Sequence, residues 1–94
     1  MEIIISSTTT TDPIVLNHDS DNFKVSVFGV VSGDFSGDWT VEYSPNGEDW
    51  FPHEDLTAVT AYKNGNLYFQ VPYIRVVTNI TAGTLKFYVY GSEA

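Results

Sequence analysis

Residues 84–90 read Thr-Leu-Lys-Phe-Tyr-Val-Tyr, and this stretch decides the fold class. Its apolar side chains at 85, 87 and 89 alternate with Lys86, Tyr88 and Tyr90. A period of two places one row of side chains on a core and the other row on solvent or on a neighbour, as in a β-strand. The same alternation recurs in residues 23–27, 39–43, 67–71 and 74–76. No stretch has the spacing of an amphipathic helix, so the sequence predicts an all-β protein.

Turn-forming residues fall between these runs. Ser, Gly, Asp and Asn cluster at residues 32–38, 45–47, 63–66 and 82–83, and Asn64-Gly65 is the strongest candidate for a tight hairpin. Short strands joined by such turns are typical of a sandwich or a small barrel. We predict an antiparallel β-sandwich of the jelly-roll or immunoglobulin-like type. Its expected strands are residues 2–6, 13–17, 22–31, 38–44, 49–52, 56–62, 66–71, 73–78 and 84–90.

Length and charge narrow the possible functions. The 94 residues allow one domain, and the absence of cysteine excludes disulfides and thiolate metal sites. The net charge of −8 leaves four scattered cations, Lys24, Lys63, Arg75 and Lys86, which are too few for a phosphate backbone or an anionic membrane. We therefore expect neither nucleic acid nor membrane as a partner. No apolar run approaches the ~20 residues of a membrane span, and the start of the chain lacks the basic residues of a signal peptide, so synthesis in the cytoplasm is expected.

The first twelve residues differ from the rest. Ile3, Ile4 and Ile5 precede a polar run, residues 6–11, that is rich in threonine and shows no packing pattern. This segment, residues 1–12, is interpreted as an N-terminal arm or an edge strand, with residues 13–94 as the sandwich domain. A frayed terminus is the alternative. Three isoleucines at an unpaired edge would be adhesive, so we favour an arm that adds a strand to a neighbouring subunit and can be deleted without unfolding the sandwich.

No catalytic or metal-binding motif stands out. His18 and His53 lie in polar, turn-like segments without a partner at metal-ligating spacing, and no serine lies in a nucleophile elbow. Both histidines are interpreted as solvated loop residues. Paired acids such as Asp19 and Asp21 could bind calcium, but acids that cap their own turns are the favoured interpretation. We expect no enzyme activity and no cofactor.

The aromatic content is high, at 15% of the residues. Tyr88 and Tyr90 share the polar phase of the last strand, and Tyr68 lies opposite its apolar neighbours. Exposed tyrosine and tryptophan mark protein interfaces or sugar-stacking platforms. We therefore predict an interface that includes Ile3, Ile4, Ile5, Tyr68, Tyr88 and Tyr90.

Two segments resemble a known hairpin and a known closing strand pair. Residues 41–50 run from a strand into Ser44, Asn46, Gly47 and Trp50. This pattern resembles the hairpin of discoidin-like β-sandwich domains and of small phage structural proteins. Residues 71–76, with Tyr73 and Arg75, and residues 82–89 resemble their closing strands. In the hairpin, Asn46-Gly47 suits a positive-φ turn, Ser44 can cap it, and Trp50 can fold back over it. Arg75 is expected to pair with an acid.

Small, acidic, cysteine-free chains with this motif look like bacteriophage capsid decoration (cement) proteins. The resemblance implies a subunit at the virion surface that stabilises the shell, with the major capsid protein or another virion protein and further copies of itself as partners. A homotrimer is the expected assembly. The first alternative is a carbohydrate-binding module that uses Trp39, Trp50 and surface tyrosines, with or without calcium. The second is an enzyme inhibitor or another small adaptor. The neighbourhood of the gene and the oligomeric state distinguish these functions.

Overall fold

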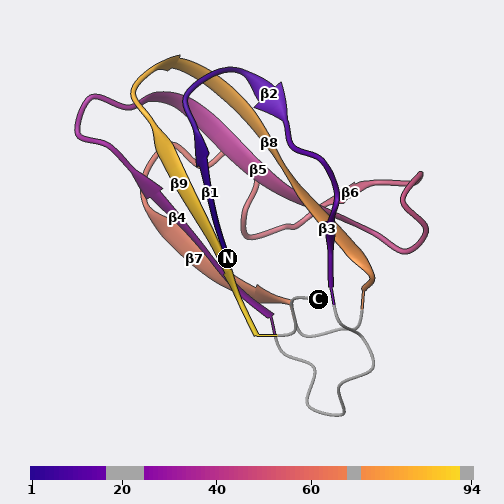
Figure 1. Ribbon diagram of the computed structural model, residues 1–94. Helices are drawn as coiled ribbons and strands as arrows, with labels where there is room; N and C mark the ends of the chain where they lie inside the picture. Colours follow the sequence, from indigo (N-terminus) through magenta and orange to yellow (C-terminus); the bar gives the residue numbers. More distant parts are fainter. Residues whose placement is uncertain (17–24, 68–70, 92–94) are drawn as a thin grey trace.

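The computed structural model describes residues 1–16, 25–67 and 71–91, and it consists of two antiparallel β-sheets packed against each other (Figure 1). The described residues contain no helix. The predicted all-β sandwich is confirmed.

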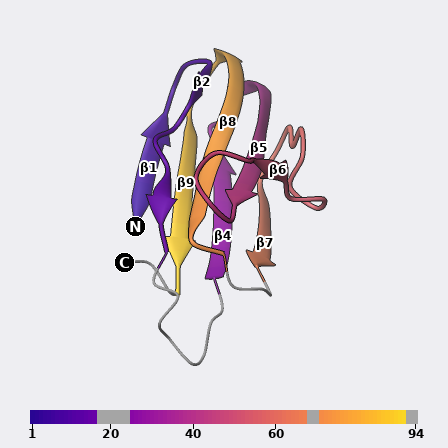
Figure 2. The same ribbon diagram turned by 90° about the vertical axis from the view of Figure 1, so that its right-hand side faces the viewer.

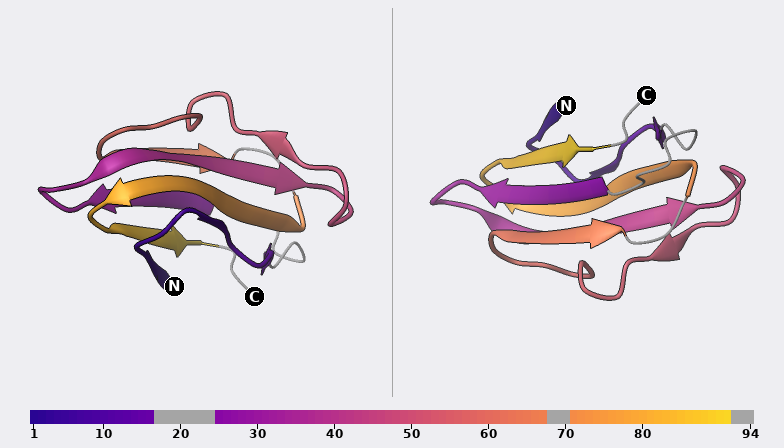
Figure 3. Two further views of the ribbon diagram at one scale, coloured as in Figure 1. Left: turned by 90° about the horizontal axis from the view of Figure 1, so that it is seen from above. Right: turned by 90° about the horizontal axis from the view of Figure 1, so that it is seen from below.

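Each sheet collects strands from distant parts of the chain. In the first sheet the order is β1 (Glu2–Ile5), β9 (Leu85–Tyr90), β4 (Val25–Val31) and β7 (Lys63–Leu67). In the second sheet the order is β2 (Thr9–Thr10), β8 (Tyr73–Ala82), β5 (Ser36–Ser44) and β6 (Phe51–Pro52), and β3 (Ile14–Val15) also pairs with β8. The long strands β5 and β8 run side by side, as the two views of Figure 3 show.

The connections between strands identify the type of sandwich. Strands β2 and β3 act as one interrupted strand along β8. Of the other strands that follow one another in the chain, all except β5 and β6 belong to different sheets, as Figure 2 shows for β1 and β2. The resulting orders, β1-β9-β4-β7 and β2/β3-β8-β5-β6, are those of a jelly roll. Of the two sandwich types predicted, the structure has the jelly roll.

The core lies between the sheets and follows the alternation seen in the sequence. Val25 and Val27 of β4, Phe87 of β9 and Trp39 of β5 belong to this core, and all four side chains are fully buried. The rings of Trp39 and Phe87 meet edge to face, with 6.2 Å between their centroids. The inward position opposite Trp39 is Gly29, where a Cβ atom would overlap the indole ring. A glycine in the middle of β4 therefore makes room for the largest core side chain.

Two of the predicted elements are wrong. Residues 56–62 form a loop rather than a strand, because Leu56 turns into the core and only Val59 bridges to Trp39. Asn64-Gly65 is not a hairpin turn either, because both residues lie inside β7 and pair with β4. The reason is packing: a Cβ atom at Gly65 would lie 2.9 Å from Cδ1 of Leu56. The glycine leaves space for a side chain from the loop and is not needed for a turn.

The N-terminal segment is built into the domain. Strand β1 pairs with β9 along its whole length, and the threonine run continues along β8. The buried Thr78 holds that run, because its Oγ1 donates to the carbonyl of Ser7 (2.8 Å) and accepts the N–H of Thr9 (3.0 Å). The edge-strand alternative agrees with β1, which is the outermost strand of its sheet. The expectation of an arm without a partner in its own domain is wrong, because strand partners 67 to 86 residues away cannot be seen in the local sequence.

Candidate interaction surface

Among the described residues, four of the seven large apolar side chains that are exposed lie on the outer side of the first sheet. Because side chains alternate along a strand, β4 and β9 bury one row and direct the other row outward. We call this surface the aromatic face; it comprises Ile4, Phe28, Val30, Tyr62, Tyr88 and Tyr90. Tyr62 joins it from the loop directly before β7, and Ile4 joins it from β1.

The rings on this face are ordered against one another. Phe28 lies directly opposite Tyr88 in the β4–β9 register. Tyr88 and Tyr90 stack with 6.2 Å between their centroids and 6° between their planes, and Phe28 meets Tyr90 edge to face at 5.9 Å. The Oη of Tyr62 accepts a hydrogen bond from Nδ2 of Asn64 at 2.9 Å. Such contacts hold the rings in place before any partner binds, which lowers the entropy cost of binding.

The face is also open to solvent. Relative exposure is 60% for Ile4, 53% for Tyr62 and 50% for Tyr90. Between Phe28, Val30 and the three tyrosines lies a shallow hollow of about 330 Å³. Tyrosine is enriched at protein interfaces, and exposed apolar patches mark binding surfaces.

Charge is sparse on this sheet, although the protein is strongly acidic. Within the described residues, the four strands of the sheet contain one acid, Glu2, and two lysines, Lys63 and Lys86. The other described acids lie in the second sheet and in the loops. A surface with few charges on an otherwise acidic protein has the composition that is typical of the core of an interface.

Glu2 affects the neighbouring tyrosine directly. It lies opposite Tyr88 in the β1–β9 register. Its hydrogen bond to the phenol, followed by desolvation and by the negative charges of Glu2 and Tyr90, raises the pKa of Tyr88 above its ordinary value. Tyr88 therefore stays a neutral phenol at physiological pH, and its O–H donates to the Glu2 carboxylate.

The outer side of the second sheet is arranged differently. Nε of Arg75 donates to Oε1 of Glu42 at 2.7 Å, and the Arg75 guanidinium lies 4.1 Å from the centroid of the Trp50 ring. The predicted acid partner for Arg75 is confirmed. Trp50, which was predicted to fold back over its hairpin, lies against the Arg75 side chain of β8. One face of the indole is thereby occupied by a residue of the same domain.

The turn that positions Trp50 is held by two polar side chains. Oγ of Ser44 accepts the N–H groups of Asn46 (3.2 Å) and Gly47 (2.8 Å), and Oδ1 of Asn46 accepts those of Glu48 and Asp49, both at 2.9 Å. Gly47 has φ of 80° and packs near the Tyr73 ring. The sequence motif thus has a structural role in closing the β5–β6 connection.

The predicted interface residues do not all lie on one surface. Tyr88, Tyr90 and Ile4 lie on the aromatic face, whereas Ile5 is 5% exposed and belongs to the core. Ile3 is half-buried on the inner side of β1. Including Ile5 in an interface is wrong, because alternation along β1 sends neighbouring isoleucines to opposite sides. Tyr68 lies outside the described residues.

Residues that the sequence did not single out complete the aromatic face. Phe28, Val30 and Tyr62 come from regions distant from β9 along the chain. If the alternation in residues 23–27 is continued through Gly29, Phe28 and Val30 are expected to point outward. Nothing in the local sequence indicates, however, that β4 lies beside β9. Trp39, proposed for sugar stacking, is fully buried and cannot serve that purpose.

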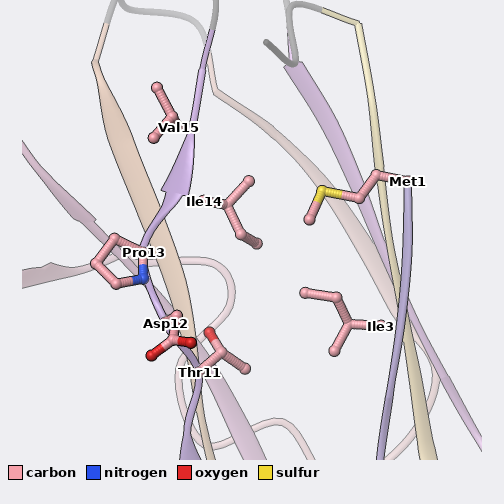
Figure 4. Close-up of a pocket in the computed structure, with 7 residues that line it drawn as sticks. All are labelled: Met1, Ile3, Thr11, Asp12, Pro13, Ile14 and Val15. Atoms are coloured by element: carbon pink, nitrogen blue, oxygen red, sulfur yellow. The ribbon is translucent and has the colours of Figure 1, made fainter.

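An apolar groove of about 410 Å³ separates the edges of the two sheets (Figure 4). Met1 and Ile3 from the first sheet point toward Ile14 of β3, and Thr11, Asp12, Pro13 and Val15 complete the lining. The groove runs along β1, the outermost strand of its sheet.

His53 is a structural residue. It is 8% exposed, its Nε2 lies 2.9 Å from the carbonyl of Asn66, and its Nδ1 accepts the N–H of Asp55 at 3.2 Å. These contacts require a proton on Nε2 and join the loop after β6 to β7. The expectation of a solvated His53 is wrong, because the loop folds over the edge of β7. His18 lies outside the described residues.

The described part of the chain contains no group of three or more His, Cys, Asp or Glu placed to hold a metal ion. It also contains no helix that is long and apolar enough to cross a membrane. Comparisons with protein-family models, with curated proteins and with solved structures found no match.

Proposed function

We propose that this protein is a non-enzymatic structural subunit of a virion, which decorates and stabilises the capsid shell at the virion surface. The aromatic face carries this proposal. Its partners are the major capsid protein or another virion protein, together with further copies of the chain. Jelly rolls occur in capsid proteins and also in lectins, so the fold permits this function without specifying it.

The proposal rests on an ordered apolar surface with few charges, on a protein whose other described surfaces carry most of the acids. Ring stacking fixes Tyr88, Tyr90 and Phe28, so that little freedom is lost when a partner covers them. Tyrosines in such positions often supply most of the binding energy of an interface. The described acids outside this sheet make the other surfaces unfavourable for an acidic neighbour, so the aromatic face is the favoured contact with the shell.

Shell binding tests the proposal. Capsids assembled from the major capsid protein encoded nearest to the gene are sedimented with the purified protein. We expect Tyr90→Ser to weaken co-sedimentation at least tenfold. The matched control is Phe51→Ser, since Phe51 is 48% exposed but lies on β6 of the other sheet. Equal binding by the two variants, or a gene far from any capsid gene, would contradict the proposal.

A carbohydrate-binding module is the second candidate, and the hollow between the three tyrosines favours it. Tyr62, Tyr88 and Tyr90 offer ring faces to a sugar, and Asn64 and Lys86 supply polar groups beside them. A glycan array with the unchanged protein and with Tyr90→Ser separates the two candidates. Selective binding that Tyr90→Ser removes, without any binding to shells, would favour the sugar.

A further inference from the structure

Strand β1 pairs with β9 on one side only, so alternate backbone N–H and C=O groups of β1 point away from its sheet. Met1 and Val89 exchange two hydrogen bonds, with Val89 N–H to Met1 O at 3.0 Å and the Met1 amine to Val89 O at 3.2 Å. Hydrogen-bonded pairs alternate in an antiparallel ladder, so Ile3 bonds to Phe87 and the N–H and C=O groups of Glu2 and Ile4 point away from β9.

Nothing in residues 1–16, 25–67 and 71–91 bonds to these outward groups of Glu2 and Ile4. The opposite edge of the same sheet is treated differently. There His53 bonds to the carbonyl of Asn66 on β7, and Leu56 of the same loop packs against Gly65. Proteins normally block or charge an exposed strand edge. Among the described residues, a side chain from a loop bonds to the backbone of the β7 edge, whereas none bonds to the outward groups of β1.

We propose that β1 pairs with β1 of a second copy of this chain, antiparallel about a two-fold axis through Ile3. Glu2 of each copy then bonds to Ile4 of the other copy, which gives four intermolecular hydrogen bonds. The two sheets become one continuous eight-stranded sheet. This pair joins two copies, in place of the trimer that the resemblance implies, and it does not depend on shell binding.

Charge selects this register over its neighbour. Shifting the axis to Glu2 would place two carboxylates directly opposite each other, which is unfavourable. With the axis at Ile3, Glu2 of one copy lies in the same cross-strand row as Lys86 of the other, because Ile4 is opposite Lys86 within each copy. The two charged residues are then two strand spacings apart, about 10 Å, and each copy supplies one such attraction.

The groove beside β1 fits the same arrangement. Side chains at position 3 of the two copies would meet across the axis on the inner side, at the mouth of the groove lined by Met1, Ile3 and Ile14. The two-fold axis is perpendicular to the sheet, so the two aromatic faces would lie side by side on the same side of the dimer. A partner would then meet one surface of twice the area.

Light scattering or sedimentation equilibrium of the full chain tests the pairing. We expect the mass of two copies for the unchanged protein. Ile4→Pro removes the outward N–H and leaves the ladder to β9 intact. The dissociation constant should rise about tenfold to a hundredfold, because each copy loses one intermolecular hydrogen bond. Ile4→Thr keeps the N–H and is the matched control, with a much smaller effect; thermal melting checks that both variants fold.

A charge exchange gives an independent measurement. Glu2→Lys places like charges in the shared row and should weaken the dimer, and Lys86→Glu in the same chain should restore it. Three copies in solution, a monomer at high concentration, or equal masses for Ile4→Pro and Ile4→Thr would overturn the proposal. Tyr90→Ser should leave the dimer intact, so that loss of shell binding and loss of pairing are separable.

Discussion

The two outer faces of the sandwich contain aromatic rings in contrasting states. On the second sheet, Trp50 is covered on one side by Arg75, which is itself paired with Glu42. On the first sheet, Tyr88 and Tyr90 stack on each other, and Tyr90 stays half exposed. On the second sheet the aromatic residue is covered by a side chain of the same domain. On the first sheet the rings are held by one another and remain accessible to a partner.

This difference teaches that aromatic content alone does not locate an interface. An outward ring with an intramolecular cation above it contributes to folding. Outward rings without such a cover, in a sheet with one acid among its described strands, are available to a partner. Four predictions test this contrast between residues that serve the fold and residues that are available to a partner.

The largest effect is expected in the core, which both faces share. Trp39→Ala should lower the free energy of unfolding by about 3–5 kcal/mol, because it leaves a cavity between Gly29 and Phe87. Denaturant unfolding measures the loss. A change below 1 kcal/mol would mean that the sheets can close over the gap and that the tryptophan is not the centre of the core.

The adjacent isoleucines of β1 separate core from face within a single strand. Ile5→Thr should cost at least about 2 kcal/mol, since it removes packing and buries a hydroxyl. Ile4→Thr should change stability by less than about 0.5 kcal/mol, because Ile4 is exposed. Thermal or urea unfolding of both variants gives the comparison, and similar losses would contradict the assignment of the two sides of β1.

On the second face, Arg75→Ala should destabilise the fold by about 1–2 kcal/mol through loss of the contact with Trp50 and the pair with Glu42. A double-mutant cycle with Trp50→Leu isolates the ring contact. Binding to any partner of the aromatic face should be unchanged. Impaired binding by Arg75→Ala would show that the second face also participates.

The smallest expected effect concerns Tyr88. Glu2→Gln removes the carboxylate that raises its pKa, so the phenol should ionise at a lower pH than in the unchanged protein. Because the folded state favours the neutral phenol, its contribution to stability is complete below the ordinary tyrosine pKa and is lost as pH rises through the folded value. Ultraviolet titration of the phenolate, with Tyr90→Phe to simplify the spectrum, measures the shift. An unchanged titration would contradict the contact.

Local sequence determined much of this structure. Alternation in residues 84–90 and in the related runs predicted strands and the inward phase of Phe87, Val41 and Ile74, because burial of every second side chain needs no knowledge of the strand partner. The hairpin residues Ser44, Asn46 and Gly47 were also predictable, since their hydrogen bonds join residues only a few positions apart.

The contacts between residues that are far apart in the sequence were decided by the tertiary structure alone. Asn64-Gly65 has the composition of a turn but lies in a strand, because Leu56 needs the space above Gly65. The threonine run pairs with β8, and the jelly-roll order brings Phe28 beside Tyr88 and Ile4 beside Lys86. An alternating pattern states which side of a strand is buried but not which strand lies next to it. The side chains that gather on one face therefore follow from packing across the whole chain.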